Sequence, residues 1–183
     1  MNLLPEIVSC KTREEMNRQC DELYAAIAEF IREVPEDQLT VNAFPEGWSV
    51  AKNIRHINRS TRLFMRWTRA PRWLIALRGK AKNPGRVEKL TATNRPPHYD
   101  YGTYQKRAPA PAGLRQQLID ELMAAADFYK QSLALRTEEE LDSLMGLFGG
   151  SLRTFSLFTL KHASHHVGVA KKRFQQVAAA SQV

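Results

Sequence analysis

The chain has 183 residues, of which 43% are hydrophobic and 25% are charged. This composition is typical of a globular domain, and no apolar run is long enough to cross a bilayer, so a membrane-spanning protein is excluded. The first ten residues lack the charged-then-apolar order of a signal peptide, and we therefore expect a cytoplasmic protein with no membrane partner. Only two cysteines occur, and Cys20 falls on an apolar helical stripe, which favours a buried free thiol over a disulfide.

The formal net charge is +8 and the sequence pI is about 9.7, so the chain is compatible with nucleic acid or anionic substrates as partners. Its basic residues are spread along the sequence rather than gathered in one run. Spread charge is typical of a solvated surface, so charge alone does not predict a nucleic-acid partner.

Two long helices are predicted in the first half of the chain. Residues 12–34 carry apolar side chains at three- and four-residue steps, and Thr12 with Glu15 forms a capping box at their start. Ser49 is a suitable N-cap for a second helix over residues 50–69.

A long connection follows the second predicted helix. Residues 72–78 are expected to add a short helical turn, whereas residues 79–112 lack periodicity and contain many prolines and glycines. A connection of this length is unusual inside a compact domain. We interpret it as a lid over a site or as a partly ordered surface excursion, and its three tyrosines favour a packed loop.

Two more long helices are predicted in the second half, over residues 113–135 and 152–177. A capping box that starts at Thr137 predicts a short helix between them, which would reach Phe148.

Four long helices without an alternating strand pattern predict an all-α fold. The natural packing of such helices is a four-helix bundle, here with long inter-helix connections. We expect a single domain over residues 1–183, with its core at about residues 12–177.

Two histidines on the last predicted helix occupy positions where a packed helix normally places leucine or valine. His162 and His166 are four residues apart, so a helix stacks both rings on one face. Leu152 and Phe155 lie on the same stripe at helical spacing. A buried imidazole costs free energy unless its nitrogen atoms find partners, and a shared metal ion is one such partner. The best candidate for a third ligand is His56, which lies at the edge of the buried face of the second predicted helix or inside it.

Three histidines from two helices match a known style of metal site within helical bundles. Neutral imidazole suits zinc, nickel, copper and iron, and three protein ligands leave a position open, as in catalytic sites. The spacing HxxxH is weak evidence by itself, and the alternative is that these histidines lie on the helix surface or have ordinary hydrogen-bond partners.

A wider pattern consists of Gly47-Trp48-Ser49, His56 and the run His162-Ala163-Ser164-His165-His166-Val167-Gly168. In order and separation, this pattern resembles the DinB/YfiT-like family of metalloenzymes, over about residues 12–175. The resemblance implies a four-helix bundle in which His56, His162 and His166 bind a divalent metal. It favours zinc or nickel, with iron or manganese as further candidates.

Characterised members of that family are metal-dependent thiol transferases or isomerases that use bacillithiol, mycothiol or glutathione. The resemblance therefore implies a thiol-dependent S-transferase or a hydrolase that acts on a small electrophilic substrate, with a low-molecular-weight thiol as cosubstrate. Relatives commonly form homodimers, and Trp67, Trp73 and Leu74 could lie at such an interface, although core burial explains them equally well. The alternative hypothesis is a non-enzymatic basic helical bundle that binds a protein or nucleic-acid partner through the arginines of the second helix.

The sequence departs from the family pattern in two places. Val169 stands where the family often has glutamine, and the neighbours of the first ligand, such as Arg55 and Asn58, include no acidic residue. An altered pocket or a lost activity would be consistent with these changes. We interpret His165 as a neighbour of the site, with a rival role as a substitute ligand, and His98 as an ordinary loop histidine.

Overall fold

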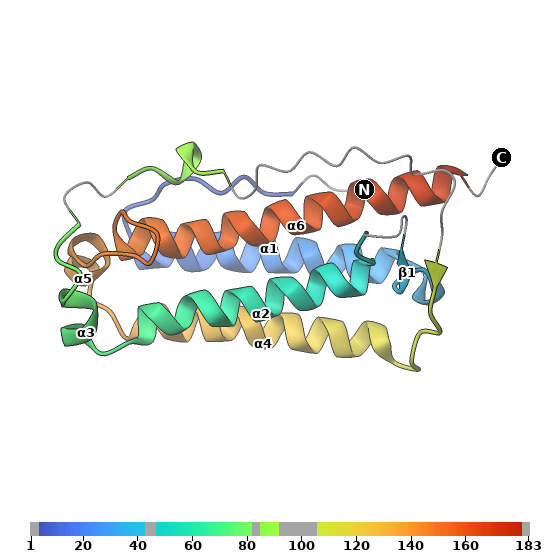
Figure 1. Cartoon of the computed structure of the whole chain (residues 1–183), viewed down its shortest axis with the longest axis horizontal. Helices are drawn as coiled ribbons and strands as arrows, with labels where there is room; N and C mark the ends of the chain where they lie inside the picture. The colour runs from blue at the N-terminus through green and yellow to red at the C-terminus, as the bar shows by residue number, and fades with distance from the viewer. Residues whose placement is uncertain (1–3, 43–46, 82–84, 92–105, 181–183) are drawn as a thin grey trace.

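The computed structural model describes residues 4–42, 47–81, 85–91 and 106–180 (Figure 1). Most of these residues are helical, which confirms the predicted all-α class. Within the described residues, the strands are limited to β1 (Val41–Asn42) and β2 (Lys106–Arg107), which pair in an antiparallel manner. None of the described helices combines the length and the hydropathy that a membrane span requires.

Four long helices lie side by side in Figure 1: α1 (Arg13–Glu33), α2 (Val50–Arg69), α4 (Leu114–Ala134) and α6 (Leu152–Ala180). Helix α2 packs against α4 and α6, and α1 packs against the same two helices. The predicted bounds of the first three are correct to within one residue, whereas α6 extends three residues beyond its predicted end. The shorter helical elements are η1 (Glu36–Gln38), α3 (Arg72–Ala76), η2 (Val87–Lys89) and α5 (Glu138–Ser143).

The predicted N-caps are present and explain where the helices begin. The Thr12 hydroxyl accepts a hydrogen bond from the Glu15 backbone N–H, and the Glu15 carboxylate accepts one from the Thr12 backbone N–H. The same reciprocal pair occurs at the start of α5, and the Ser49 hydroxyl caps α2. These bonds satisfy backbone donors that have no partner within the helix.

The expectation that the short helix reaches Phe148 is wrong. Helix α5 ends at Ser143, and Leu144 is extended and forms an isolated bridge with Lys80. The chain then turns back, because the Gly146 backbone N–H donates to the carbonyl of Gly150. A side chain on Gly146 would come within 2.5 Å of the Phe155 Cβ atom, so only glycine permits this close approach to α6.

The core lies between the four long helices, and the apolar stripes predicted from the sequence are buried there. Cys20 is a buried free thiol, as expected. The largest fully buried side chains include Met16, Leu23, Tyr24, Phe30, Ile54, Ile57, Met65 and Tyr129.

The described part of the long connection lies against α6. The Lys161 ammonium donates hydrogen bonds to the backbone carbonyls of Val87 and Glu88, at 2.8 and 3.0 Å. The Val87 side chain is buried, and the Glu88 carboxylate accepts a hydrogen bond from the Ser9 hydroxyl. Residues 92–105, with the three tyrosines and His98, lie outside the described residues.

Candidate metal centre

The structure brings His56, His162 and His166 together. Helix α2 carries His56, and α6 carries the other two. One ring nitrogen from each residue lies within 4.8 Å of the other two. The ring centroid of His56 is 5.3 Å from that of His162 and 4.4 Å from that of His166. The ring centroids of His162 and His166 are 4.6 Å apart. The three residues singled out in the sequence thus form one cluster, and their binding of a metal stays a prediction.

The cluster forms where the buried stripe of α6 meets the edge of α2. Leu152 and Phe155 are buried at the start of this stripe, and the two histidines continue it one turn apart. The Ser60 hydroxyl donates to the backbone carbonyl of His56 at 2.8 Å and lies 3.4 Å from the Nδ1 atom of His162. Ser60 therefore links the two helices at the cluster.

Burial keeps the three imidazoles neutral near pH 7. Burial first, and the neighbouring histidines second, lower the pKa of His162 to about 4 and that of His166 to about 3, because two cationic rings would repel each other. The pKa of His56 is also lowered, first by burial and then by the positive charge of Arg59. Neutral imidazole is the form that binds metals.

Aromatic side chains contact each histidine of the cluster. The Trp48 ring meets His56 edge to face at 4.9 Å and stacks on His166 at 6.0 Å. The Phe64 ring centroid lies 5.4 Å from that of His162. Sequence reasoning noted Trp48 in the family pattern but gave it no place in the site, and it did not connect Phe64 with the histidines.

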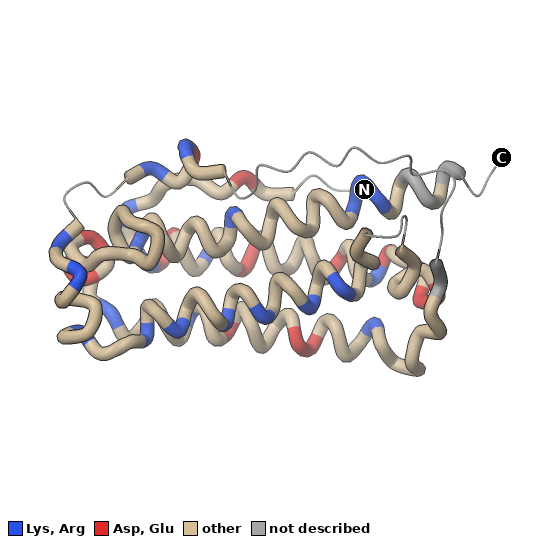
Figure 2. Tube along the Cα trace, in the orientation of Figure 1, with Lys and Arg blue, Asp and Glu red and all other residues tan. Residues whose placement is uncertain are grey.

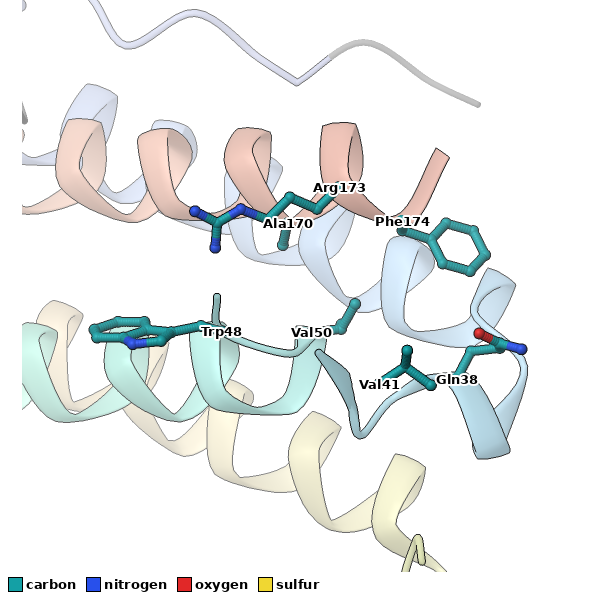
Figure 3. A pocket seen from close by; sticks show the side chains of 7 residues that line it. All are labelled: Gln38, Val41, Trp48, Val50, Ala170, Arg173 and Phe174. Carbon is teal, nitrogen blue, oxygen red and sulfur yellow. The ribbon is translucent and has the colours of Figure 1, made fainter. Parts of the chain in front are cut away.

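Beyond Trp48, a pocket lies between the start of α2 and the end of α6 (Figure 3). In Figure 3, the Trp48 ring lies at the end of this pocket farthest from Gln38. The volume is only about 20 Å³, which is enough for one water molecule, so this pocket is too small for a substrate. Its lining residues are Gln38, Val41, Trp48, Val50, Ala170, Arg173 and Phe174.

The polar groups around the cluster are basic or neutral. In the described part of the chain, no carboxylate is hydrogen-bonded to the three rings, and the Ser60 hydroxyl is the polar group beside His162. On α2, Lys52 lies over the Trp48 ring at 5.3 Å, and Arg59 is exposed. The sequence places no acidic residue next to His56, and in the described part of the structure no carboxylate is hydrogen-bonded to any of the three histidines.

The remaining candidates lie outside the cluster. His165 is a half-buried neighbour, with its ring 5.4 Å from that of His166, and its nitrogen atoms do not belong to the converging group. Trp67 donates its indole N–H to the backbone carbonyl of Met145, whereas Trp73 is 67% exposed and Leu74 is 38% exposed.

The three residues fit a nitrogen-ligated divalent cation. Zinc binds histidine nitrogen at about 2.0–2.1 Å, which places two nitrogen ligands of a tetrahedral ion about 3.3 Å apart. The observed nitrogen atoms lie within 4.8 Å of one another, so metal binding would bring them closer by up to about 1.5 Å. Three neutral donors from two well-packed helices would leave at least one coordination position open.

A family model described as the DinB superfamily matches residues 19–170, a span that includes all of α2, the part of α6 up to residue 170 and the three histidines. Comparison with curated proteins gave no significant match, and neither did comparison with solved structures.

Proposed function

The chain belongs to the DinB superfamily, and on this premise we propose that it is a metal-dependent enzyme whose three clustered histidines hold one divalent ion. One observation supports this function above all others: three neutral ring nitrogens converge within 4.8 Å on a face where the sequence pattern calls for apolar side chains. Zinc or nickel suits such a site best, and iron or manganese is a further candidate. A bound divalent ion would lower the pKa of a coordinated water or thiol.

The chain itself would supply the shape and polarity of the site. Burial keeps His162 and His166 neutral, so that protons do not compete for their nitrogen atoms at neutral pH. The hydroxyl of Ser60 would orient the His162 ring, as outer partners commonly do for metal-binding histidines. The rings of Trp48 and Phe64, which contact His56 and His162, would limit the access of water to the site.

The reaction class that fits this site is transfer of a low-molecular-weight thiol to a small electrophile, or hydrolysis of such an electrophile. Both need a nucleophile that is deprotonated near neutral pH. We infer that the four long helices form a four-helix bundle of the DinB/YfiT-like type, as one domain. The exposed Trp73 would suit a homodimer interface.

An activity screen tests this function. Metal-free protein would be loaded with zinc or nickel and assayed for consumption of glutathione, mycothiol and bacillithiol in the presence of small electrophiles. We expect turnover with the loaded wild type and none with the loaded His56→Ala variant, while His165→Ala serves as the matched control. Equal turnover in wild type and His56→Ala would contradict the proposal.

A second candidate function has a specific observation in its favour. Basic residues run along α2 in Figure 2, and this helix contains no acidic residue. Within the described residues, none of the exposed arginines on α2 forms an ion pair. They are Arg55, Arg59, Arg62, Arg66 and Arg69. A basic helical bundle that binds a protein or nucleic-acid partner would use this face, and fluorescence anisotropy with a short DNA duplex at low salt would detect binding that weakens steeply as salt is added.

A further inference from the structure

A group of four phenylalanines lies next to the histidine cluster. Phe64 comes from α2, Phe148 from the turn before α6, and Phe155 and Phe158 from α6. The Phe64 ring centroid is 5.6 to 6.4 Å from the other three, and that of Phe148 is 5.6 to 5.8 Å from those on α6. These separations are typical of favourable aromatic pairs. Phe148 nevertheless remains 63% exposed, which is unusual for a large apolar side chain in an aromatic cluster.

A cavity of about 480 Å³ opens beside this cluster. Phe148, Phe155 and Phe158 form one wall, Leu90 and Thr91 lie in the described part of the long connection, and glycines contribute backbone. The described lining contains no charged side chain, and its polar side-chain groups are two threonine hydroxyls. Pockets of 300 to 1,000 Å³ with mostly apolar lining are the usual sites for small molecules.

Glycines hold the two sides of this cavity in place. Gly149 and Gly150 have φ angles of +91° and +66°, which favour glycine and turn the chain so that Phe148 stands over α6. On the opposite side, the Thr154 hydroxyl donates to the backbone carbonyl of Gly85 at 3.4 Å. The positions of Phe148 and Gly85 at the cavity thus depend on these backbone turns and on this hydrogen bond.

The wall of the cavity adjoins the histidine cluster along α6, although none of the three histidines is among the described lining residues. Phe158 precedes His162 by four residues, a distance of about 6 Å along a helix. Its ring lies 6.3 Å from that of His162, and the Phe64 ring lies 5.4 Å from the same histidine. A molecule whose apolar part filled the cavity would therefore lie against the Phe158 ring, which is next to His162.

We propose that this cavity binds the apolar ring of the substrate, so that the electrophile is an aromatic or bulky apolar compound rather than a small polar one. This inference rests on the proposed function, because the occupant is a substrate only if the chain is an enzyme. The binding of an apolar ring does not itself require a metal. The uncharged lining disfavours an anionic or cationic group there, because no partner in the described lining would compensate the loss of hydration. The phenylalanine rings favour an aromatic occupant, whose edges and faces they can contact.

The neutral fluorophore N-phenyl-1-naphthylamine tests this inference on the full-length, metal-free chain. We expect saturable binding of one molecule per chain, with a dissociation constant that rises about fivefold to tenfold in Phe148→Ala, as the loss of one aromatic contact predicts. Leu90→Trp would weaken binding by filling the cavity, which tests the same site without removing a wall. Leu135→Ala, which removes a similarly exposed apolar side chain outside the lining, should bind like the wild type.

Two results would overturn the inference. One is unsaturable binding, or equal binding by wild type and Phe148→Ala. The other is a wild-type dimer that excludes the fluorophore and becomes a monomer in Phe148→Ala, which would show that a second copy of the chain covers the cavity.

Nuclear magnetic resonance of the histidine rings tests the position of the cavity. The fluorophore should shift the His162 ring resonances, assigned with His162→Gln, and should leave those of His165 nearly unchanged. Binding without a shift at His162 would contradict a link between cavity and cluster. Since both measurements use metal-free protein, they can succeed even if the chain binds no metal, and a failure of either leaves the metal proposal standing.

Discussion

The two halves of the helical interior differ in polarity. Among the described residues, α1 and α4 each contain one buried polar side chain, Gln19 and Ser132, whereas α2 contains five and α6 contains four. The half-buried histidines add to the polar character of the α2–α6 side. Apolar burial is the main favourable term in folding, and buried polar groups cost free energy unless they are paired. We infer that α1 and α4 mainly stabilise the fold, and that α2 and α6 give up part of this stabilisation to form a site.

The largest expected effect comes from the apolar half. Leu122→Ala removes a fully buried side chain from α4 and should lower the free energy of unfolding by about 2–5 kcal/mol. It should leave the metal content of the folded protein unchanged, because α4 carries none of the three histidines. Urea denaturation measures the first quantity. Met123→Ala is the matched control, since this neighbour is 41% exposed and should change the free energy by less than about 0.5 kcal/mol.

The next effect concerns the polar half. Zinc at one hundred times its dissociation constant should stabilise the wild type by about 2.7 kcal/mol, which raises the midpoint of thermal unfolding by roughly 5 to 10 °C. His56→Ala should lose most of this rise, because two ligands hold a metal less tightly than three. A scan of both proteins with and without zinc makes the comparison, and an equal rise in both would argue against a role for His56.

Acid should weaken the metal-free protein through the same side of the interior. The pKa of His162 is about 4 and that of His166 about 3 in the folded protein, both below the ordinary value of 6.5. At a pH between these folded-state values and 6.5, the unfolded chain therefore binds more protons than the folded protein. The free energy of unfolding consequently decreases as the pH falls from about 6.5 toward 4. Urea denaturation at pH 7 and pH 5 should show a smaller loss for His162→Leu/His166→Leu than for the wild type, and equal losses would contradict the assignment.

The smallest effect tests the charge next to the site. Arg59→Gln should raise the pKa of His56 slightly, since the positive charge of Arg59 is the second cause of its lowering, after burial. Arg62→Gln, one turn further along the exposed face, is the control and should change this pKa less. Titration of the His56 ring resonances would detect the difference, and equal values for both variants would show that the charge of Arg59 does not reach the site.

Much of the fold follows from short-range signals in the sequence. Capping residues such as Thr12 and Ser49 lie within a turn of the backbone groups that they bind, and so the starts of the helices could be predicted. The end of α5 could not, because it depends on the close approach of Gly146 to Phe155, a contact between separate elements. The two-residue strands were missed for a similar reason, since so short a pair leaves no alternating pattern.

The histidines of the candidate site could be predicted from the sequence, whereas the aromatic residues around them could not. The spacing of His162 and His166 determines that they share a helical face. His56 was the best candidate for the third ligand from its place on the second predicted helix, and the resemblance to a family pointed to the same residue. The positions of Trp48, Phe64 and Phe148 depend on how helices and turns pack in space, and no spacing within one segment reveals them. Their aromatic side chains are the part of the site for which the structure was required.

Metal content tests the central claim most directly. Protein prepared without a polyhistidine tag would be reconstituted with zinc or nickel, desalted and measured by elemental analysis, for the wild type, the His162→Ala/His166→Ala variant and the His165→Ala control. We expect about one metal ion per chain in the wild type and in the control, and almost none in the double variant. A wild type without metal after reconstitution, or a double variant with the same content as the wild type, would contradict a three-histidine metal site.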